Sequence, residues 1–284
     1  MSDTINRHIP FPVKCGVLFG GVYNIGGWLF LGLGLIIYWH YAFNIDLSFL
    51  HFTGNIIKTN GKVIDSFELT DSDDDEPIFE THYKFKTSEG VEFEDFSYST
   101  GFSISKDKII RVEYPEGNPQ YSRVEGLRRE AYGPNALFVL LFPVAGLILI
   151  FTGSKKSIII LKLLKSGQLA HGKLVSKEQL DIKVNDDPVY KLTFQFKDEL
   201  GNTYHISEKT HMTYVLEDDD TEKLLYMKDN PDCATMIDSI PSSPVLDEAG
   251  NVSPSSTAHS LMPAILPLLT IVGHGMYAAV RFIL

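Results

Sequence analysis

The chain has 284 residues and a formal net charge of −11, and its mean hydropathy of 0.00 averages strongly apolar segments with strongly acidic ones. The acidic balance argues against a nucleic-acid partner, because phosphate binding requires a basic face. Two cysteines, Cys15 and Cys233, are too few and too far apart for a disulfide framework. The composition therefore permits a reducing or an oxidising compartment.

The first apolar segment, residues 15–41, follows an N-terminal flank of residues 1–14. It exceeds the roughly 20 apolar residues that a helix needs to cross a bilayer, and it contains no Asp, Glu, Lys or Arg. Trp39 and Tyr41 stand at its end, where aromatic residues often mark the membrane interface. We predict a transmembrane helix rather than a cleaved signal peptide, since the apolar run is too long for one and no small-x-small cleavage pattern follows.

Several residues of this segment are spaced to form one stripe along a helix: Gly16, Gly20, Asn24, Gly27 and Gly34. Glycines let helix backbones approach closely, and such packing drives helix association in lipid. We therefore predict that the stripe packs against another helix, of the same chain or of a second protomer. The alternative is that it reflects only the general frequency of glycine in membrane spans.

The second apolar segment, residues 135–153, is barely long enough for a transmembrane helix and contains Pro143, which would kink it. The following residues, 154–168, combine isoleucines and leucines with four lysines: Lys155, Lys156, Lys162 and Lys165. This pattern predicts an amphipathic interfacial helix whose lysines reach the lipid headgroups. The alternative is a helix that packs under the domain that follows.

The third apolar segment, residues 260–284, follows a stretch, residues 241–259, whose serines and prolines indicate a linker. We predict a third transmembrane helix here. His274 is a candidate intramembrane polar residue, because an ionisable group within a span is a functional candidate. A hydrogen bond to a neighbouring helix is the interpretation we prefer for it.

Lysine and arginine near the ends of the spans set the orientation of a membrane protein. Their distribution slightly favours a cytoplasmic N-terminus, with the polar regions before and after the second segment on opposite sides of the membrane. If the second segment only dips into the bilayer, both regions lie on one side.

The two polar regions repeat one another at an offset of about 111 residues. Gly61-Lys62 recurs as Gly172-Lys173, Tyr83-Lys-Phe85 as Phe194-Gln-Phe196, and Gly90 as Gly201. After a slip of one residue, Tyr114 recurs as Tyr226. Self-similarity of this kind indicates duplication of one structural unit.

Each repeat alternates apolar and polar residues in short runs between turn signals, as antiparallel strands do. The runs 63–69, 79–86, 91–98 and 108–114 predict strands in the first copy, and runs at 172–180, 189–197, 203–207 and 223–226 predict them in the second. We therefore predict two homologous small antiparallel β-sheet or barrel domains, residues 55–128 and 170–240.

The first repeat combines Gly61-x-Val63, an acidic loop, Pro77-x-Phe79 with alternating aromatics, Gly90, and a final strand ending in Tyr114-Pro-x-x-Asn-Pro119. This pattern resembles the membrane-associated DUF3592 domain family, and the second repeat resembles it more weakly, with Met227 in place of the proline. The resemblance implies a β-domain tethered to a membrane and implies no particular reaction or ligand.

The sequence indicates no catalytic residue, cofactor or metal ion. The acidic run at 71–76 lacks the glycine and the final glutamate of an EF-hand, so we interpret it as a solvated loop. His205 and His211 flank Glu208 without a third histidine or a Cys-x-x-Cys pair, which a zinc site would need. Serine-hydrolase, zinc-protease and phosphate-loop motifs are also absent from the sequence.

We predict a multi-pass integral membrane protein that combines membrane α-helices with all-β domains: three transmembrane helices and the two β-domains. The leading hypothesis for function is a non-catalytic interaction or scaffold protein, whose partners are the lipid bilayer and either another protein or a second copy of the chain. An oligomeric transport or channel subunit is the alternative, and a membrane-bound hydrolase is the third.

Overall fold

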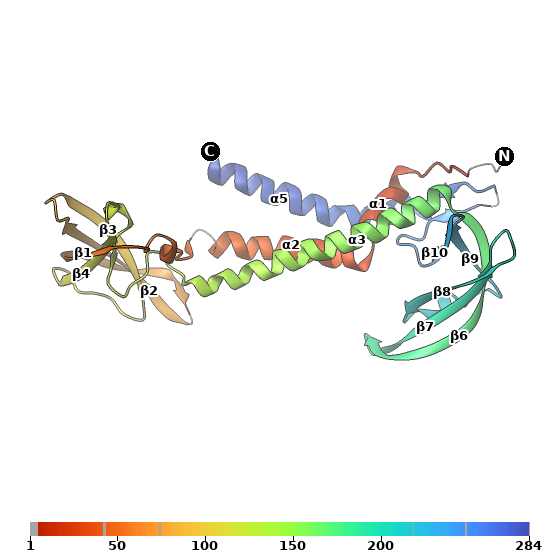
Figure 1. Ribbon diagram of the computed structural model, residues 1–284, viewed down its shortest axis with the longest axis horizontal. Coiled ribbons are helices and arrows are strands. Elements are labelled where there is room, and N and C mark those ends of the chain that lie inside the picture. The colour runs from red at the N-terminus through yellow and green to blue at the C-terminus, as the bar shows by residue number, and fades with distance from the viewer. Residues whose placement is uncertain (1–4, 42–43, 74, 218, 248, 284) are drawn as a thin grey trace. The chain divides into compact units, whose positions relative to one another are not determined.

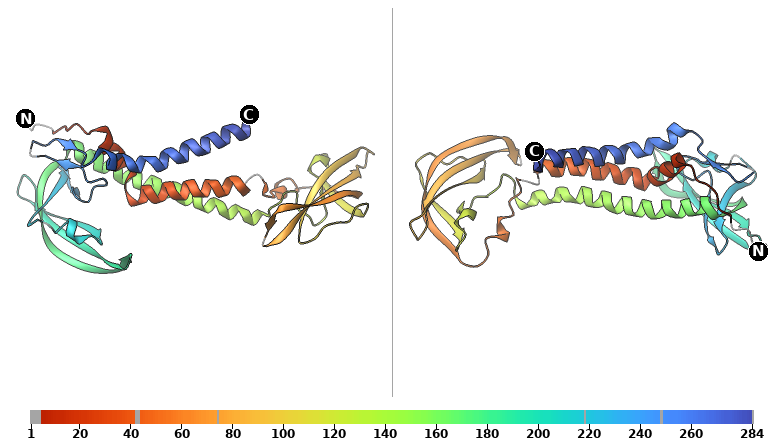
Figure 2. Two further views of the ribbon diagram at one scale, coloured as in Figure 1. Left: turned by 180° about the vertical axis from the view of Figure 1, so that it is seen from behind. Right: turned by 90° about the horizontal axis from the view of Figure 1, so that it is seen from above.

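We describe the fold from a computed structural model of the chain, for residues 5–41, 44–73, 75–217, 219–247 and 249–283. The chain forms two compact units. The first unit combines residues 1–32 with residues 143–284, and the second unit is the continuous stretch 33–142. Each unit contains a five-stranded β-sheet (Figures 1 and 2).

The described helices are α1 (Phe11–Phe19), α2 (Val22–Tyr41), α3 (Leu141–Ser166), α4 (Thr257–Leu261) and α5 (Ile265–Phe282). Three helical stretches of the described chain are long and apolar enough to cross a membrane: Val22–Tyr41, Pro134–Ser166 and Thr257–Phe282. Their positions agree with the three apolar segments of the sequence, while their boundaries differ.

The first apolar segment is not one helix. It breaks at Gly20-Gly21, where the amide of Gly20 donates to the carbonyl of Gly16 at 2.8 Å and ends α1. Val13 and Val17 of α1 are buried in a core beside the second sheet. The first helix long enough to cross a membrane therefore begins at Val22 rather than at residue 15. Two adjacent glycines, which are poor helix formers, permit this break, and the uniformly apolar sequence does not reveal it.

The second segment and the predicted interfacial helix are one continuous helix, α3, which a 3₁₀ turn at Pro134–Leu140 precedes. Its last turns bury Ile160, Leu163 and Leu164 against the second sheet, so this end of α3 packs under the β-domain. The prediction of a separate interfacial helix at residues 154–168 was therefore wrong. Arg7 closes the helix end, since its guanidinium donates to the carbonyl of Gly167 at 2.7 Å.

The predicted linker, residues 241–259, contains regular structure in its described parts. Strands β11 (Val245–Leu246) and β12 (Val252–Ser253) form a small hairpin, and Leu246 and Val252 join the core beside the second sheet. Ser256 then caps α4, because its hydroxyl accepts from the amide of His259 at 3.4 Å. Burial of Leu246 and Val252 therefore gives a defined structure to a segment whose composition is that of a linker.

The first sheet belongs to the stretch 33–142 and has the order β3-β2-β1-β4-β5. Its strands are β1 (Ile56–Asp73), β2 (Glu76–Lys86), β3 (Glu92–Thr100), β4 (Ile109–Pro115) and β5 (Arg123–Val124). All neighbouring pairs are antiparallel. The predicted strand at 63–69 is thus the middle of a longer strand, which extends to Asp73 of the acidic run; Asp74 lies outside the described residues.

The second sheet has the order β10-β9-β6-β7-β8 and is also antiparallel. Its strands are β6 (Gln168–Val184), β7 (Asp187–Lys197), β8 (Thr203–Thr210), β9 (Glu222–Met227) and β10 (Asn230–Met236). Figure 1 shows them in green to blue, with β9 and β10 beside the end of α3.

The two sheets share strand order and register. Val63 lies opposite Tyr83, and Leu174 lies opposite Phe194. Each first strand has two irregularities, after Val63 and Glu68 in one sheet and after Leu174 and Gln179 in the other, at the offset of 111 residues found in the sequence. A bulge bends a strand and redirects its side chains. Two unrelated sheets would rarely have bulges at matching positions.

The two cores also match residue by residue. The rings of Phe93 and Tyr114 lie 5.8 and 5.5 Å from that of Phe85. In the second sheet the rings of Tyr204 and Tyr226 lie 5.8 and 5.4 Å from that of Phe196. Gly61 and Gly172 face these cores, where an added Cβ would lie 2.7 Å from Val112 and 2.9 Å from Leu224. The glycines therefore recur because neither site has room for a side chain.

Candidate functional site

A cavity of about 440 Å³ lies where the helices of the first unit meet the second sheet. We name it the junction cavity. It is lined by the start of α2 (residues 20–24), by α3 (residues 153–160), by the end of β8 and the loop after it (residues 208–216), and by residues 235–241. All of these segments belong to the same compact unit.

One wall of the junction cavity is closed by a buried polar chain. Asn24 is 1% exposed, and its Nδ2 donates to Ser157 Oγ at 3.2 Å. Ser157 Oγ in turn donates to the carbonyl of Val17 at 2.8 Å, which ties α1, α2 and α3 together. The Oδ1 atom of Asn24 has no hydrogen-bond partner among the described residues. It lies against Gly153, where an added Cβ would be only 2.6 Å away.

Glu208 supplies a carboxylate on the inner side of the sheet. It follows Tyr204 and Ile206 at period two on β8, and both of these side chains pack against the core. Ser239 Oγ donates to Glu208 Oε1 at 3.2 Å. Burial raises the pKa of the Glu208 carboxyl, and the nearby charge of Lys156 and the hydrogen bond from Ser239 oppose this shift.

The first sheet also has a carboxylate on the inner side of its third strand, but its partners surround it. Asp95 Oδ2 accepts from Ser122 Oγ at 2.7 Å and lies 3.5 Å from Arg129 Nη2, while the amide of Phe96 donates to Oδ1 at 3.0 Å. Asp95 is therefore part of a satisfied structural network, whereas Glu208 faces a cavity. This contrast makes the junction cavity the candidate site.

Charges of both signs line the junction cavity, and apolar groups fill the space between them. Lys156, Lys209 and His211 lie with Glu208 and Asp238, beside Ile160, Val215 and Leu216. Such a lining suits binding of a ligand that carries both charges on a partly apolar body.

Glu208 was not predicted as a site residue from the sequence, where it appeared only as the neighbour of His205 and His211. The signal that identifies it is the alternation Tyr204, Ile206, Glu208, which places a carboxylate at a position where the strand pattern calls for an apolar side chain. His205 is exposed, while His211 follows the end of β8 and lines the cavity.

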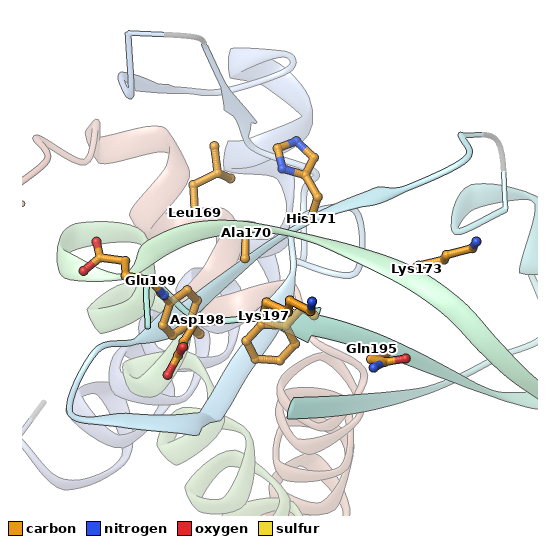
Figure 3. A pocket seen from close by; sticks show the side chains of 10 residues that line it. Leu169, Ala170, His171, Lys173, Gln195, Lys197, Asp198 and Glu199 are labelled. Carbon is orange, nitrogen blue, oxygen red and sulfur yellow. The ribbon is translucent and has the colours of Figure 1, made fainter. Parts of the chain in front are cut away.

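A second hollow, of about 550 Å³, lies over strands β6 and β7 of the same sheet (Figure 3). In Figure 3 its labelled polar side chains, such as His171, Lys173 and Glu199, lie apart from one another. Asp198 accepts hydrogen bonds from the turn at Asn202, and Glu199 pairs with Lys228 at 2.8 Å. These carboxylates stabilise the local turn and do not converge on one point.

The predicted glycine stripe does not lie on one helix face. Gly16 packs against residues beyond the second sheet, since an added Cβ would lie 2.6 Å from the Cβ of Ser242. Gly20 ends α1, and Gly34 lies in α2. Of the five residues, Asn24 and Gly27 contact α3 within the first unit, through Ser157 and Ile150 respectively.

The contact between α2 and α3 depends on glycines of both helices. An added Cβ on Gly27 would lie 2.8 Å from the amide nitrogen of Ile150, and one on Gly146 would lie 2.5 Å from that of Leu31. Gly146 and Gly153 have the same sequence spacing as Gly20 and Gly27, so a periodic signal was present in the second segment, and it was missed.

The remaining predicted residues have varied surroundings. His274 Nε2 lies 3.1 Å from the carbonyl of Gly32, as a contact between α5 and α2 requires. Lys155 Nζ lies 4.3 Å from the centre of the Phe151 ring, and Lys156 lines the junction cavity. Lys162 and Lys165 are exposed on the face of α3 opposite the buried leucines.

No protein-family model, curated protein or solved structure matches this chain. The resemblance of the repeats to the DUF3592 family therefore stays a prediction.

Proposed function

We propose that the chain is a non-catalytic, multi-pass membrane protein that presents two copies of one β-domain for interaction with other molecules. The three long apolar helices support membrane anchoring, since many of their large apolar side chains are exposed and need lipid to cover them. Leu147 and Ile148 of α3 and Leu268 and Leu269 of α5 are each more than half exposed.

Duplication of one ancestral domain accounts for the matching architecture. Shared strand order alone would be weak support, because small antiparallel sheets recur in unrelated proteins. Matching irregularities in β1 and β6, together with glycines at 61 and 172 that face equivalent core residues, are more specific.

The observation that carries the proposed interaction role is the difference between the outer faces of the two sheets. In the first sheet the ring of His82 lies 5.5 Å from that of Phe67 and 5.8 Å from that of Phe96. We name these three residues the aromatic face. Phe67 is 51% exposed and Phe96 is 38% exposed.

The equivalent positions in the second sheet are Glu178, Thr193 and Ser207. Thr193 and Ser207 are bonded to each other at 3.0 Å through their hydroxyls. The second sheet folds with the same register without aromatic residues there, so the fold does not require the aromatic face. Exposed aromatic residues that are not needed for folding are typical of interaction surfaces.

Charge indicates the kind of partner that the aromatic face would bind. Residues 55–128 contain 16 acidic and 9 basic side chains, a net charge of −7. Glu80 borders the aromatic face and accepts from Tyr98 Oη at 2.9 Å. The expected partner is a protein segment that offers basic and apolar side chains, because complementary charge steers association.

The test is chemical crosslinking of the tagged full chain in its own membrane, followed by mass spectrometry. The variant Phe67→Ser with Phe96→Ser should lose a protein that the unmodified chain captures. The control is Val91→Ser with Ile109→Ser, two exposed apolar residues of the same domain outside the aromatic face. Capture of the same proteins in the same yield by all three chains would refute the role of this face.

A transport role would use polar side chains between the helices, and Asn24 and His274 are the candidates for it. Asn24 is bonded to Ser157, and His274 lies against the carbonyl of Gly32. The Nδ2 atom of Asn24 and the ring of His274 therefore serve in contacts between helices, and no particular observation favours a transport role.

A further inference from the structure

We propose that the junction cavity binds a phosphate ester that carries a primary amine, the chemistry of a phosphatidylethanolamine headgroup. The inference rests on the proposed membrane anchoring and is independent of the aromatic face. It names a ligand class for the cavity between the start of α2, the middle of α3 and the end of β8.

The place of the cavity along the helices suits a lipid headgroup. Its lining includes Val22 and Tyr23, the first residues of the first membrane-length helix. Val22 is 86% exposed, and Ile25 on the next turn is also exposed. A headgroup in the cavity would therefore have its acyl chains beside apolar side chains of α2, at the level where a span enters the bilayer.

The amine half of the ligand is recognised by acceptors. Glu208 is on the inner side of the sheet with Ser239 Oγ as its hydrogen-bond donor, and Asp238 also lines the cavity. A carboxylate facing a partly apolar cavity is stabilised most by a charged donor. A primary ammonium group supplies three N–H donors, which fits this pair of acids.

A quaternary ammonium group fits less well. It has no N–H to donate, and proteins recognise it with several aromatic side chains around it. Tyr23 is the one Phe, Tyr or Trp among the described residues that line the cavity. The lining thus favours ethanolamine over choline.

The phosphate half of the ligand is recognised by the lysines and by backbone amides. Lys156 on α3 and Lys209 on β8 are both among the residues that line the cavity. The first amides of α2 have no partner within that helix, and an N-terminus of this kind attracts anions.

An independent observation also indicates a ligand with donors. Asn24 lines the cavity, is 1% exposed, and its Oδ1 has no hydrogen-bond partner in the described chain. Buried acceptors are almost always paired with a protein or solvent donor. A ligand with N–H or O–H groups would supply one at this wall.

The experiment uses the purified full chain in detergent and native mass spectrometry. The chain is titrated with phosphatidylethanolamine, phosphatidylcholine and phosphatidylglycerol of identical acyl chains. Phosphatidylethanolamine should bind about tenfold more tightly than phosphatidylcholine, the size of effect expected from one charge-assisted hydrogen bond. Soluble glycerophosphoethanolamine is added as a competitor, to separate a lipid headgroup from a free phosphate ester.

Glu208→Gln should reduce the preference for phosphatidylethanolamine over phosphatidylcholine to about onefold, and Asp238→Asn should reduce it in part. Lys156→Gln should weaken all three lipids. The control is Glu199→Gln, an exposed carboxylate of the same domain that pairs with Lys228, and it should bind as the unmodified chain does.

Equal binding of phosphatidylethanolamine and phosphatidylcholine by the unmodified chain would overturn the proposal, as would an unchanged preference in Glu208→Gln. Competition by glycerophosphoethanolamine at equal concentration would support the phosphate-amine chemistry and assign it to a soluble ester. Extraction of the chain from membranes by alkaline carbonate would instead refute the membrane anchoring, so the two failures are distinguishable.

Discussion

Gly27 of α2 and Gly146 of α3 pack so closely that neither position has room for a side chain. An added Cβ on Gly27 would lie 2.9 Å from the carbonyl oxygen of Gly146, and one on Gly146 would lie 2.7 Å from that of Gly27. The obstacles are backbone atoms, which cannot rotate out of the way. This reciprocal contact sets the separation of the two helices where they cross.

We expect Gly27→Ile to destabilise the chain by about 1–3 kcal/mol or more, because a side chain forced against a packed backbone strains the fold. The matched control is Gly26→Ile, since an added Cβ on Gly26 meets nothing within 4 Å. Thermal unfolding in detergent measures both variants. Equal melting temperatures for the two would show that the glycine contact does not set the helix packing.

The continuous length of α3 leads to a prediction about topology. Residues 134–154 of the helical stretch Pro134–Ser166 lie before the first lysine and reach the roughly 20 residues that a bilayer core requires, so we expect the stretch to cross the membrane rather than dip into it. The two β-domains should then lie on opposite sides.

The measurement is labelling of single cysteines with a membrane-impermeant thiol reagent, in a chain whose Cys15 and Cys233 are replaced by serine. Ser88 and Ser207 are suitable positions because both are exposed. Labelling of both positions in intact cells would place both domains on one side and refute the crossing.

The matching aromatic cores should respond alike to truncation. Phe85 is 3% exposed and Phe196 is 2% exposed, so replacing either by alanine should cost about 3–5 kcal/mol. Phe67→Ala removes the same ring from the half-exposed aromatic face and should cost far less. Denaturant unfolding of the full chain, followed by fluorescence, measures the three variants. A cost for Phe67→Ala equal to that for Phe85→Ala would contradict the assigned cores.

Glu208 should make stability depend on pH. Burial raises the pKa of its carboxyl above the ordinary 4.5, so its contribution to stability is present below that value and is lost as the pH rises through the folded-state pKa. Lys156 from α3, Lys209 from β8 and Asp238 after β10 face the same cavity.

In lipid-free detergent, Glu208→Gln should therefore melt at a higher temperature than the unmodified chain at pH 7.5, with a difference that shrinks toward pH 4. Glu199→Gln again serves as the control. A difference that grows as the pH falls would have the opposite sign and would refute the cost of burying the ionised carboxylate.

The strands were largely predictable from the sequence, because period-two alternation and turn glycines are local signals. The repeat predicts equivalent positions for Phe85 and Phe196, and in the structure Phe85 lies opposite Phe93 as Phe196 lies opposite Tyr204. The strand ends were less predictable, since β1 continues through polar residues whose conformation is set by pairing with β2.

The ends of the helices were not predictable, because an apolar face looks the same whether it contacts lipid or protein. Ile160, Leu163 and Leu164 satisfy the pattern of an interfacial helix, yet they pack against Leu225 and Ile240 of the β-domain. Similarly, the composition of residues 241–259 does not reveal that Leu246 and Val252 are buried. The junction cavity could not be foreseen, since it joins four segments that lie far apart in the chain.

The core beside the second sheet has a consequence for the order of folding. It is built from Ile9 near the N-terminus, Leu164 in the middle and Val252 close to the last helix, whereas the first β-domain lies within one continuous stretch of 33–142. Domains generally fold as their sequence emerges during synthesis, so the first β-domain can be completed early. The other core must wait until almost the whole chain has been made, and until then α1 and the end of α3 present apolar surfaces that a chaperone or the membrane must cover.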